Sequence, residues 1–491
     1  MAGLAIVVVL ADLAMPRDGE GRAGSGAQLS LLALAGLSAP ALLSLNLWFG
    51  WFGDAGAGPG FSGAIVADRF ALFFQFILTG VTAGVIMASM GYARRLPGLR
   101  GEFIALMLFS VTGMLLLVSA RELISIYVAL ELTALPVAAL AAFGRDGRSS
   151  ESGLKFLILS GVSSAVLLYG MVYLYGYTGS TDIAVIAERI GDLSQDAGKP
   201  FGSYAVLLAV VMIVAGFGFK MAVAPWQMWV PDVYEGSPTP VAAFLSVASK
   251  ASAFAVVLRV LYTSFGASEM ARDWSALFAI LAAGTMTFGN LLALSQKNVK
   301  RLLGYSTIAQ AGYMLAGVAA VAANTRDGGG IAGPQGVLFY LAGYAFTNLA
   351  VFIAVIAITN RTGSDIISGL NGLGRRSPLM AGLLAVGLLS LLGIPPTVGF
   401  MSKVFVFSSA VNSGLVWLAV VGVLNTVISA FYYLGILRAM YFEEPADGAP
   451  IPADRPAVLA AIVATLGVGV FGFAPWLLLN LAEKALTILR V

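Results

Sequence analysis

The chain has 491 residues, of which 59% are hydrophobic and only 11% are charged. A soluble domain carries about 25% charged residues. This composition therefore excludes a soluble domain and indicates a polytopic membrane protein. Because the chain has 0 Cys and 0 His, it has no means of forming disulfides, zinc sites, histidine-ligated haem or cysteine-held iron–sulfur clusters. The net charge of +3 gives no sign of nucleic-acid binding.

Apolar segments bounded by Gly, Pro and charged residues predict an all-α fold of about fourteen transmembrane helices. Each span must be a helix, because lipid offers no hydrogen-bond partner to free backbone groups. In chain order the predicted spans are 1–15, 26–48, 69–92, 101–120, 122–143, 151–176, 203–230, 239–265, 274–295, 301–323, 335–359, 377–410, 414–442 and 457–481.

The basic residues of the short loops predict the orientation. Alternate loops that are rich in Lys and Arg are expected to face the cytoplasm. This set contains Arg17, Arg22, Arg94, Arg95, Arg100, Arg145, Arg148, Lys297, Lys300, Arg301, Arg375 and Arg376. The opposite set is poorer and contains Arg121, Arg189, Lys199, Arg272 and Arg326. With an even number of spans, both termini are then expected on the outer, periplasmic side.

Two predicted spans, 203–230 and 377–410, are too long for one straight crossing, since each would reach about 40–50 Å as an unbroken helix. Each contains helix breakers beside a lysine: Gly216, Gly218 and Pro225 around Lys220, and Gly393, Pro395, Pro396 and Gly399 before Lys403. Proline removes a helical hydrogen bond and clashes with the preceding turn, so we expect both helices to be broken.

The two expected breaks lie five spans apart, and interrupted helices at matching places in two halves indicate inverted repeats. Helices 4–8 (101–265) and 9–13 (274–442) would be two inverted five-helix repeats. They are flanked by N-terminal helices 1–3 (1–100) and by a C-terminal helix 14 (457–491). The alternative interpretation is that Gly and Pro are simply common in membrane helices.

Four ionisable residues lie deep within predicted spans: Glu131, Lys220, Lys250 and Lys403. A charged group at mid-bilayer costs about 2.5–3.5 kcal/mol on insertion scales, so four such groups indicate a function. A structural ion pair between Glu131 and one lysine would explain at most two of them.

Glutamate and lysine suit proton transfer because both change protonation state reversibly. Burial moves carboxyl and amine pKa values toward neutrality, and a nearby opposite charge reverses that shift. At about 4 Å and an effective dielectric constant near 20, such a pair interacts by about 4 kcal/mol. Making or breaking one contact can therefore load or unload a proton. Arginine cannot release one, because its pKa is too high.

Other charged residues are nearer the span ends. We expect Lys155, Arg259 and Arg438 to extend their charges to the interface, whereas Asp12 has no clear role. The polar, Pro-rich segment 226–240 contains Asp232 and Glu235. These two acids would form an entrance for protons on the cytoplasmic face. Alternatively, the segment would serve only as a loop that caps the next helix.

Several motifs resemble those of the antiporter-like membrane subunits of respiratory complex I. GFGFKMAVAPWQMWVPDVYEGSPTPVAAFLSVASK (216–250) and RLLGYSTIAQAGYMLAG (301–317) are similar to the signatures of this family. Within the family, the N-type subunit is favoured by ELISIYVALELTAL (122–135), ESGLKFLILSGVSSAVLLYGMVYLYGYTGSTDI (151–183) and LLGIPPTVGFMSKVFVF (391–407).

The resemblance implies fourteen helices, of which the seventh and twelfth are broken, and proton translocation by a chain without a redox centre. It implies that Glu131 and Lys220 form a pair, that Lys250 lies on the central hydrophilic axis, and that Lys403 connects to the outer half-channel. Many relatives have His at the position of Gln310. Glutamine does not titrate, so Gln310 is expected to donate and accept hydrogen bonds without carrying a proton.

The resemblance also implies a bacterial inner-membrane complex with NADH:quinone oxidoreductase activity. NADH, FMN, iron–sulfur clusters and quinone would be bound by other subunits, and the neighbours would be the antiporter-like M subunit and small A/J/K-type subunits. Two alternatives remain: a subunit of a multi-component Na⁺/H⁺ antiporter, and a non-transporting scaffold that would tolerate neutral replacement of the four deep charges.

Overall fold

The computed structural model of the chain describes residues 1–15, 23–50, 59–60, 63–93, 96, 99–195, 200–265, 271–320, 332–445, 448–452 and 454–486. Six of the basic loop residues from which the orientation was predicted lie outside these ranges: Arg17, Arg22, Arg94, Arg95, Lys199 and Arg326. The side chain of Arg272 is also outside the description.

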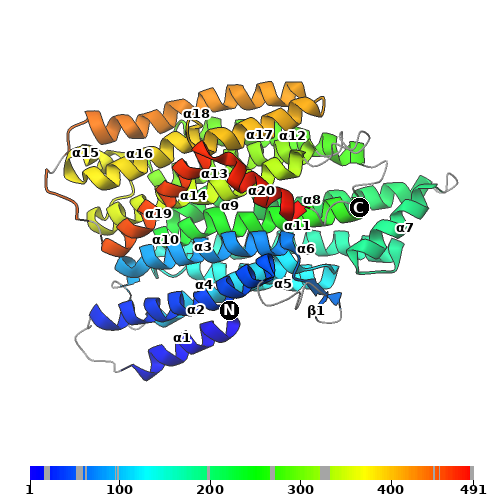
Figure 1. Cartoon of the computed structure of the whole chain (residues 1–491), viewed down its shortest axis with the longest axis horizontal. Helices are drawn as coiled ribbons and strands as arrows, with labels where there is room; N and C mark the ends of the chain where they lie inside the picture. The colour runs from blue at the N-terminus through cyan, green and yellow to red at the C-terminus, as the bar shows by residue number, and fades with distance from the viewer. Residues whose placement is uncertain are drawn as a thin grey trace.

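The described residues form a bundle of helices that run mostly along one common direction (Figure 1). The first part contains α1 (Ala2–Ala14), α2 (Ala23–Phe49), α3 (Arg69–Ala93) and the paired two-residue strands β1 (Pro59–Gly60) and β2 (Ile65–Val66). The next part contains α4 (Arg100–Ser119), α5 (Leu123–Ala141), α6 (Gly147–Thr178), α7 (Ile183–Gln195), α8 (Pro200–Met221), α9 (Trp229–Gly236), α10 (Thr239–Phe244), the π-helix η2 (Leu245–Ser249) and α11 (Lys250–Phe265).

The second half of the chain repeats this pattern of long apolar helices. It contains α12 (Ala271–Ala293), α13 (Val299–Ala319), α14 (Ala332–Thr362), the 3₁₀ turn η4 (Ile367–Leu370), α15 (Leu373–Arg376), α16 (Pro378–Leu392), α17 (Val398–Asn412) and α18 (Val416–Phe442). The described chain ends with α19 (Arg455–Phe473) and α20 (Pro475–Leu486).

The predicted fold class is confirmed. Among the described residues, 11 helices are long and apolar enough to cross a membrane. The short helix α1, the more polar α13 and the interrupted pair α16 and α17 supply the other three of the fourteen predicted spans.

Both predicted helix breaks are present. The first separates α8 from α9, and the second separates α16 from α17. Residues after each half-helix adopt left-handed backbone, with φ 63° at Ala222 and 90° at Gly393. Glycine adopts this conformation freely, whereas alanine does so at a cost of about 1–2 kcal/mol. The left-handed backbone at Ala222 in the first break is therefore stabilised by the structure around it.

Two local predictions need correction, and one helix was not predicted. The last predicted span, 457–481, is not one helix, because α19 ends at Phe473 and a new helix starts at Pro475. A residue before proline disfavours helical backbone, which accounts for the break at Ala474. The segment 226–240 is not a plain loop, since it forms α9 over Trp229–Gly236. The amphipathic helix α7 was not predicted at all, because it is too short and too polar to be a span.

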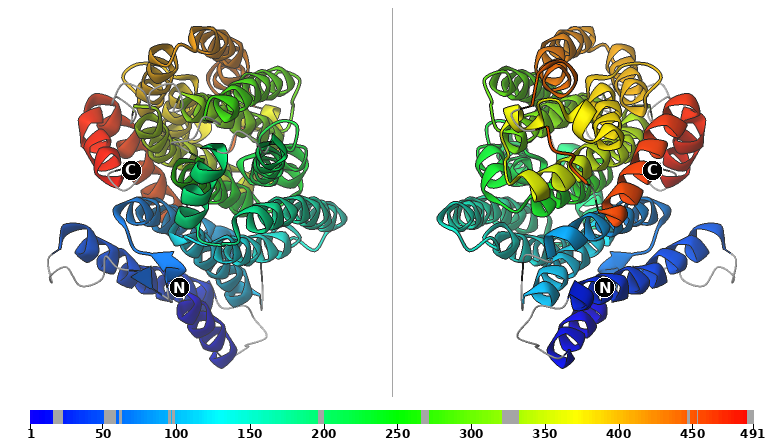
Figure 2. Two further views of the ribbon diagram at one scale, coloured as in Figure 1. Left: turned by 90° about the vertical axis from the view of Figure 1, so that its right-hand side faces the viewer. Right: turned by 90° about the vertical axis from the view of Figure 1, so that its left-hand side faces the viewer.

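The centre of the bundle is formed by α10, η2, α11 and α14. In the most apolar part of Thr239–Ser264, all residues are buried within the chain. In the most apolar part of Gly333–Thr362, 94% of the residues are buried. The corresponding share is 33% in α18 and 28% in α2, so these helices are peripheral. In the views along the bundle (Figure 2), α1 to α3 lie on one side, next to α19 and α20.

Candidate functional site

Glu131 and Lys220 lie on neighbouring helices of the first half. Lys220 is in the last turn of α8, before the helix break, and its side chain is buried. Its Nζ donates a hydrogen bond of 3.0 Å to Ser160 Oγ on α6. Glu131 on α5 is near enough for its charge to act on Lys220. In the described part of the chain, Oε1 of Glu131 is buried without a hydrogen-bond partner.

Lys403 lies beside the second helix break. It is buried on α17, and its Nζ donates to Leu392 O at 2.8 Å and to Leu391 O at 3.3 Å. These are the last carbonyl groups of α16, which have no partner within their own helix. The negative end of the α16 dipole and these carbonyls stabilise the ammonium charge. The Tyr313 ring is 4.7 Å away and adds a cation–π contact.

Lys250 lies at the centre of the bundle, at the first residue of α11. It follows the π-helix Leu245–Ser249, and short π-helical insertions are frequent at functional sites. Its buried Nζ donates to the carbonyl oxygen of Thr307 on α13. The hydroxyl groups of Thr307 and Tyr344 are 3.0 Å apart. Lys250 is thus joined to polar groups of α13 and α14.

Helix α13 continues this polar connection toward Lys403. Ser306, the neighbour of Thr307, shares a hydrogen bond with the hydroxyl group of Tyr433. Gln310 lies one turn further along α13, and its Nε2 is 3.4 Å from the same hydroxyl group. The Oε1 of Gln310 accepts a hydrogen bond from Tyr340.

Gln310 and Lys403 share one acceptor. The Nε2 of Gln310 donates to Leu391 O at 3.1 Å, and Lys403 donates to the same oxygen at 3.3 Å. The polar side chains between Lys250 and Lys403 therefore form two hydrogen-bonded sets: Thr307 with Tyr344 beside Lys250, and Ser306, Tyr433, Gln310 and Tyr340 beside Lys403. This matches the expected role of Gln310 as a group that donates and accepts hydrogen bonds but does not titrate.

A small cavity of about 10 Å³, with a mostly apolar surface, lies between Lys220 and the start of α11. Thr133, Lys220, Ser249 and Ser252 are among its lining residues. This volume is near the smallest that holds one water molecule. Because Ser249 directly precedes Lys250, the cavity lies between the Glu131–Lys220 region and the Lys250 network.

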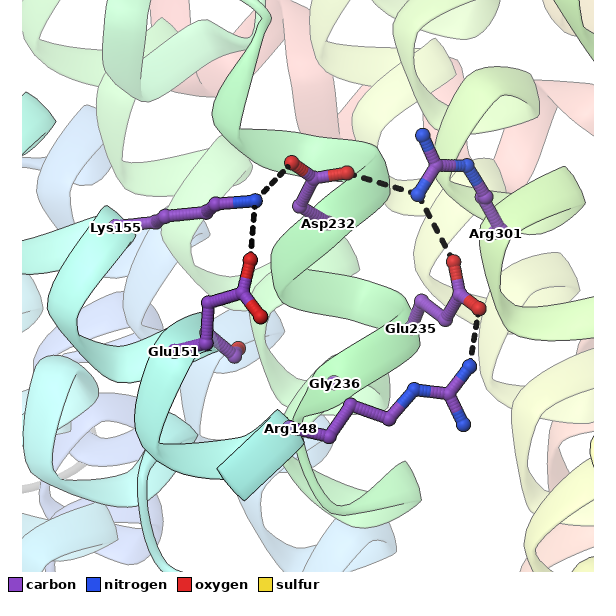
Figure 3. Close-up of a pocket in the computed structure, with 8 residues that line it drawn as sticks. Arg148, Glu151, Lys155, Asp232, Glu235, Gly236 and Arg301 are labelled. Carbon is purple, nitrogen blue, oxygen red and sulfur yellow. Dashed lines mark hydrogen bonds and ion pairs between the residues drawn. The ribbon is translucent and has the colours of Figure 1, made fainter. Parts of the chain in front are cut away.

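The two other predicted acids lie apart from this network, in a charged cluster around α9 (Figure 3). Asp232 accepts from Lys155 at 2.8 Å and from Arg301 at 2.8 Å. Glu235 pairs with Arg301 at 2.9 Å and also with Arg148. These residues line an open pocket of about 200 Å³. Through α9, the ion pairs tie α6 to α13.

Burial raises the pKa of the Asp232 carboxyl, but the hydrogen bonds from Lys155 and Arg301 outweigh it and hold the pKa below the ordinary value of 3.8. Asp232 therefore stays charged at neutral pH. Lys155 is 42% exposed and forms ion pairs with Asp232 and Glu151. Arg438 is 76% exposed beside Glu443.

The interpretation of Arg259 as an interfacial residue is wrong. Its guanidinium group is 4% exposed and makes two hydrogen bonds to Asp68, of 2.7 and 2.9 Å. It also donates to Val118 O at 3.1 Å. Asp68 is 6% exposed and caps α3 by accepting from the backbone of Ala71. Sequence reasoning missed this pair because its partners are 191 residues apart.

Comparisons with known proteins identify the family to which the chain is similar. The family described as "NADH:quinone oxidoreductase/Mrp antiporter, TM" matches residues 120–429. NADH-quinone oxidoreductase subunit N of Dehalococcoides mccartyi is 40% identical over 98% of this chain and 96% of its own length. The same-named protein of Trichlorobacter lovleyi is 38% identical over 99% of this chain and 95% of its own.

Solved structures agree as well. A chain of respiratory complex I from Thermus thermophilus with bound aureothin is 32% identical, with a TM-score of 0.74 and coverage of 98% of this chain and 97% of that one. A chain of the Mrp complex from Dietzia sp. shares the fold, with a TM-score of 0.80, 21% identity, and coverage of 99% and 97%. The chain therefore belongs to the NADH:quinone oxidoreductase/Mrp antiporter family of membrane subunits, and within it to the N subunits of NADH-quinone oxidoreductase.

Proposed function

We propose that this N-type subunit translocates protons along a route that contains Glu131, Lys220, Lys250 and Lys403. The observation that carries the proposal is the series of buried polar side chains on α13, α14 and α18 between Lys250 and Lys403, which forms two hydrogen-bonded sets. Buried polar groups at such density are costly in a membrane protein unless they serve a function. Hydroxyl groups and water can pass protons along the series, with Gln310 orienting its neighbours.

Glu131 and Lys220 form the first proton-binding site of the proposed route. An unpartnered buried carboxylate oxygen is unfavourable by about 1–3 kcal/mol, so a hydrogen-bond donor that moves to Glu131 would be stabilised there. Lys220 is bonded to Ser160 in this arrangement. Moving its ammonium group from Ser160 to Glu131 would favour the charged forms of both residues, and moving it back would favour release of a proton toward Lys250.

We infer that the chain contains two inverted repeats, 101–265 and 274–442, flanked by the helices of 1–100 and 457–491. In each repeat the fourth crossing segment is broken, at α8 and α9 and again at α16 and α17. In each, a polar residue on the second helix lies near a lysine beside that break: Glu131 near Lys220, and Gln310 near Lys403. This matching position of a polar residue near a lysine supports the two repeats in addition to the support that the helix breaks give.

Asp232 and Glu235 have an accessory part in this proposal. They lie at the open pocket around α9, and Asp232 remains charged at neutral pH. Asp232 therefore acts as a fixed charge within the ion-pair cluster and not as a group that exchanges protons. Their ion pairs also hold α9 between α6 and α13.

The chain would act within a multi-subunit NADH:quinone oxidoreductase in the bacterial inner membrane, with both termini on the periplasmic side. Its neighbours would be the antiporter-like M subunit and the small A/J/K-type subunits. NADH, FMN, iron–sulfur clusters and quinone would be bound elsewhere in the complex. The energy of quinone reduction would reach this chain through shifts of its buried charges.

The test uses the intact complex in proteoliposomes, with Glu131→Ala and Lys220→Ala. Both variants should assemble, and both should lose most of the coupled proton pumping and quinone reductase activity. Glu131→Asp, which keeps the acid, should retain more activity than Glu131→Ala. Arg438→Gln, at an exposed position, is the control and should behave as the wild type. Full coupled activity in both alanine variants would refute the proposal, and Na⁺ transport that resists a protonophore would favour an Na⁺/H⁺ antiporter.

A further inference from the structure

A buried asparagine, Asn290 on α12, lies next to the surroundings of Lys403. Its side chain is fully buried. Its Nδ2 donates a hydrogen bond of 3.0 Å to the hydroxyl oxygen of Tyr313 on α13, and its Oδ1 accepts one of 2.9 Å from the hydroxyl group of Tyr432 on α18. A buried amide is unfavourable in a membrane helix unless its hydrogen bonds are satisfied. Two tyrosines from two other helices satisfy this one.

The direction of these hydrogen bonds is fixed by Asn425 on α18. The Nδ2 of Asn425 donates to Val421 O at 3.0 Å and to Thr287 Oγ1 at 3.1 Å. Because a carbonyl oxygen only accepts, the nitrogen of this amide must face Val421, and its Oδ1 must face Asn290. That Oδ1 accepts from the Nδ2 of Asn290 at 3.1 Å. Asn290 therefore uses both of its N–H groups as donors, one to Asn425 and one to Tyr313.

The hydroxyl group of Tyr313 accepts from Asn290 and must donate its own proton to another group. It interacts with the side chains of Thr426 and Ser429 on α18. Both of these hydroxyl groups already donate to carbonyl oxygens of their own helix, Thr426 to Gly422 at 3.0 Å and Ser429 to Thr426 at 2.6 Å. They are therefore acceptors for Tyr313. The phenol oxygen is thus held from two sides, by α12 and by α18.

The ring of Tyr313 faces Lys403. The Nζ of Lys403 is 4.7 Å from the centre of this ring. Phe407, one turn further along α17, packs edge-on against the same ring with a centroid distance of 6.0 Å. A cation–π contact requires the cation to lie over the face of the ring, within about 6 Å of its centre. The hydrogen bonds that fix the phenol oxygen therefore also fix this contact.

We propose that Asn290 is a positioning residue for Lys403, because it holds the Tyr313 ring against the ammonium group and so stabilises the charged form of the lysine. The proposal rests on the proposed part of Lys403 in the proton route. The alternative is that Asn290 and Asn425 only hold α12 against α18, as polar pairs do between membrane helices. The two interpretations differ in whether the effect of Asn290 depends on the hydroxyl group of Tyr313.

The first experiment compares Asn290→Val with Asn290→Thr in the intact complex, reconstituted in proteoliposomes. The two replacements have nearly the same shape, but only threonine keeps a hydroxyl group that can donate to Tyr313. Asn290→Val should lower the rate of proton pumping about threefold or more, and Asn290→Thr should retain most of it. Leu291→Val, at the neighbouring exposed position, is the control and should pump as the wild type. Equal losses in the valine and threonine variants, with native gels showing assembly of both, would overturn the proposal.

The second experiment tests whether Asn290 acts through Tyr313. Tyr313→Phe keeps the ring and removes the hydroxyl group, so Asn290→Val and Asn290→Thr should pump equally when combined with it. Tyr313→Leu also removes the ring and should pump more slowly than Tyr313→Phe. A difference between the valine and threonine variants that persists beside Tyr313→Phe would overturn the proposal, and so would equal pumping by Tyr313→Phe and Tyr313→Leu.

Lys403→Ala separates a failure of this inference from a failure of the proton route. If Lys403→Ala pumps as the wild type does, the proposed route is wrong, and the role of Asn290 falls with it. If Lys403→Ala abolishes pumping while Asn290→Val and Asn290→Thr are alike, the route stands and only the positioning role of Asn290 is refuted.

Discussion

Replacing Arg259 with methionine would leave the Asp68 carboxylate buried without its partner. Both side chains are about 95% buried, and they make two hydrogen bonds of 2.7 and 2.9 Å. Removing one member of such a pair costs about 3–5 kcal/mol, because the remaining charge is neither paired nor solvated. The expected result for Arg259→Met is a strong loss of stability, with reduced assembly of the complex.

The measurement is the thermal unfolding midpoint of the detergent-solubilised complex, combined with native gels that report assembly. Asp68→Asn with Arg259→Met is the control, since it removes both charges and keeps an oxygen that caps α3 at Ala71. This double variant should recover most of the lost stability. If Arg259→Met alone were as stable as the wild type, or if the double variant were no better than the single one, the argument about a buried pair would be refuted.

Two other predictions concern the route and the charged cluster. Gln310→Leu should lower proton pumping about tenfold or more while the complex assembles, because it removes the hydrogen bonds that orient Tyr340 and Tyr433; Gln310→His should keep activity, and equal pumping by the two variants would contradict the proposed role. Asp232 has a depressed pKa, so its contribution to stability is present above the ordinary value of 3.8 and is lost as the pH falls through the folded-state value. The wild-type unfolding midpoint should therefore fall more steeply than that of Asp232→Asn below about pH 4, and parallel pH profiles would contradict this.

The features that the sequence predicted are those that depend on local chemistry. Apolar length located the spans, and the clusters of Gly and Pro located both helix breaks. The cost of a charge in lipid singled out Glu131, Lys220, Lys250 and Lys403. Each of these signals lies within one segment of the chain, so no knowledge of packing was needed.

The features that were missed depend on contacts between distant segments. Asp68 is close to a predicted span end, and nothing near it in the chain indicates that it pairs with Arg259. The tyrosines that lie between Lys250 and Lys403 come from α14 and α18, and their hydroxyl groups have no sequence pattern that distinguishes them from other tyrosines in apolar helices. The π-helix before Lys250 also has no local signal, since Leu245–Ser249 resembles the rest of its span.

The central claim is that the buried charges of both halves belong to one hydrated proton route. The most direct measurement is a cryo-EM map of the assembled complex at a resolution that shows ordered water. The account predicts water density between Lys220 and Lys250, beside Ser249 and Ser252, and a continuous polar path from there to Lys403. A map in which apolar side chains fill that space without water, and separate Glu131 and Lys220 from Lys250, would contradict it.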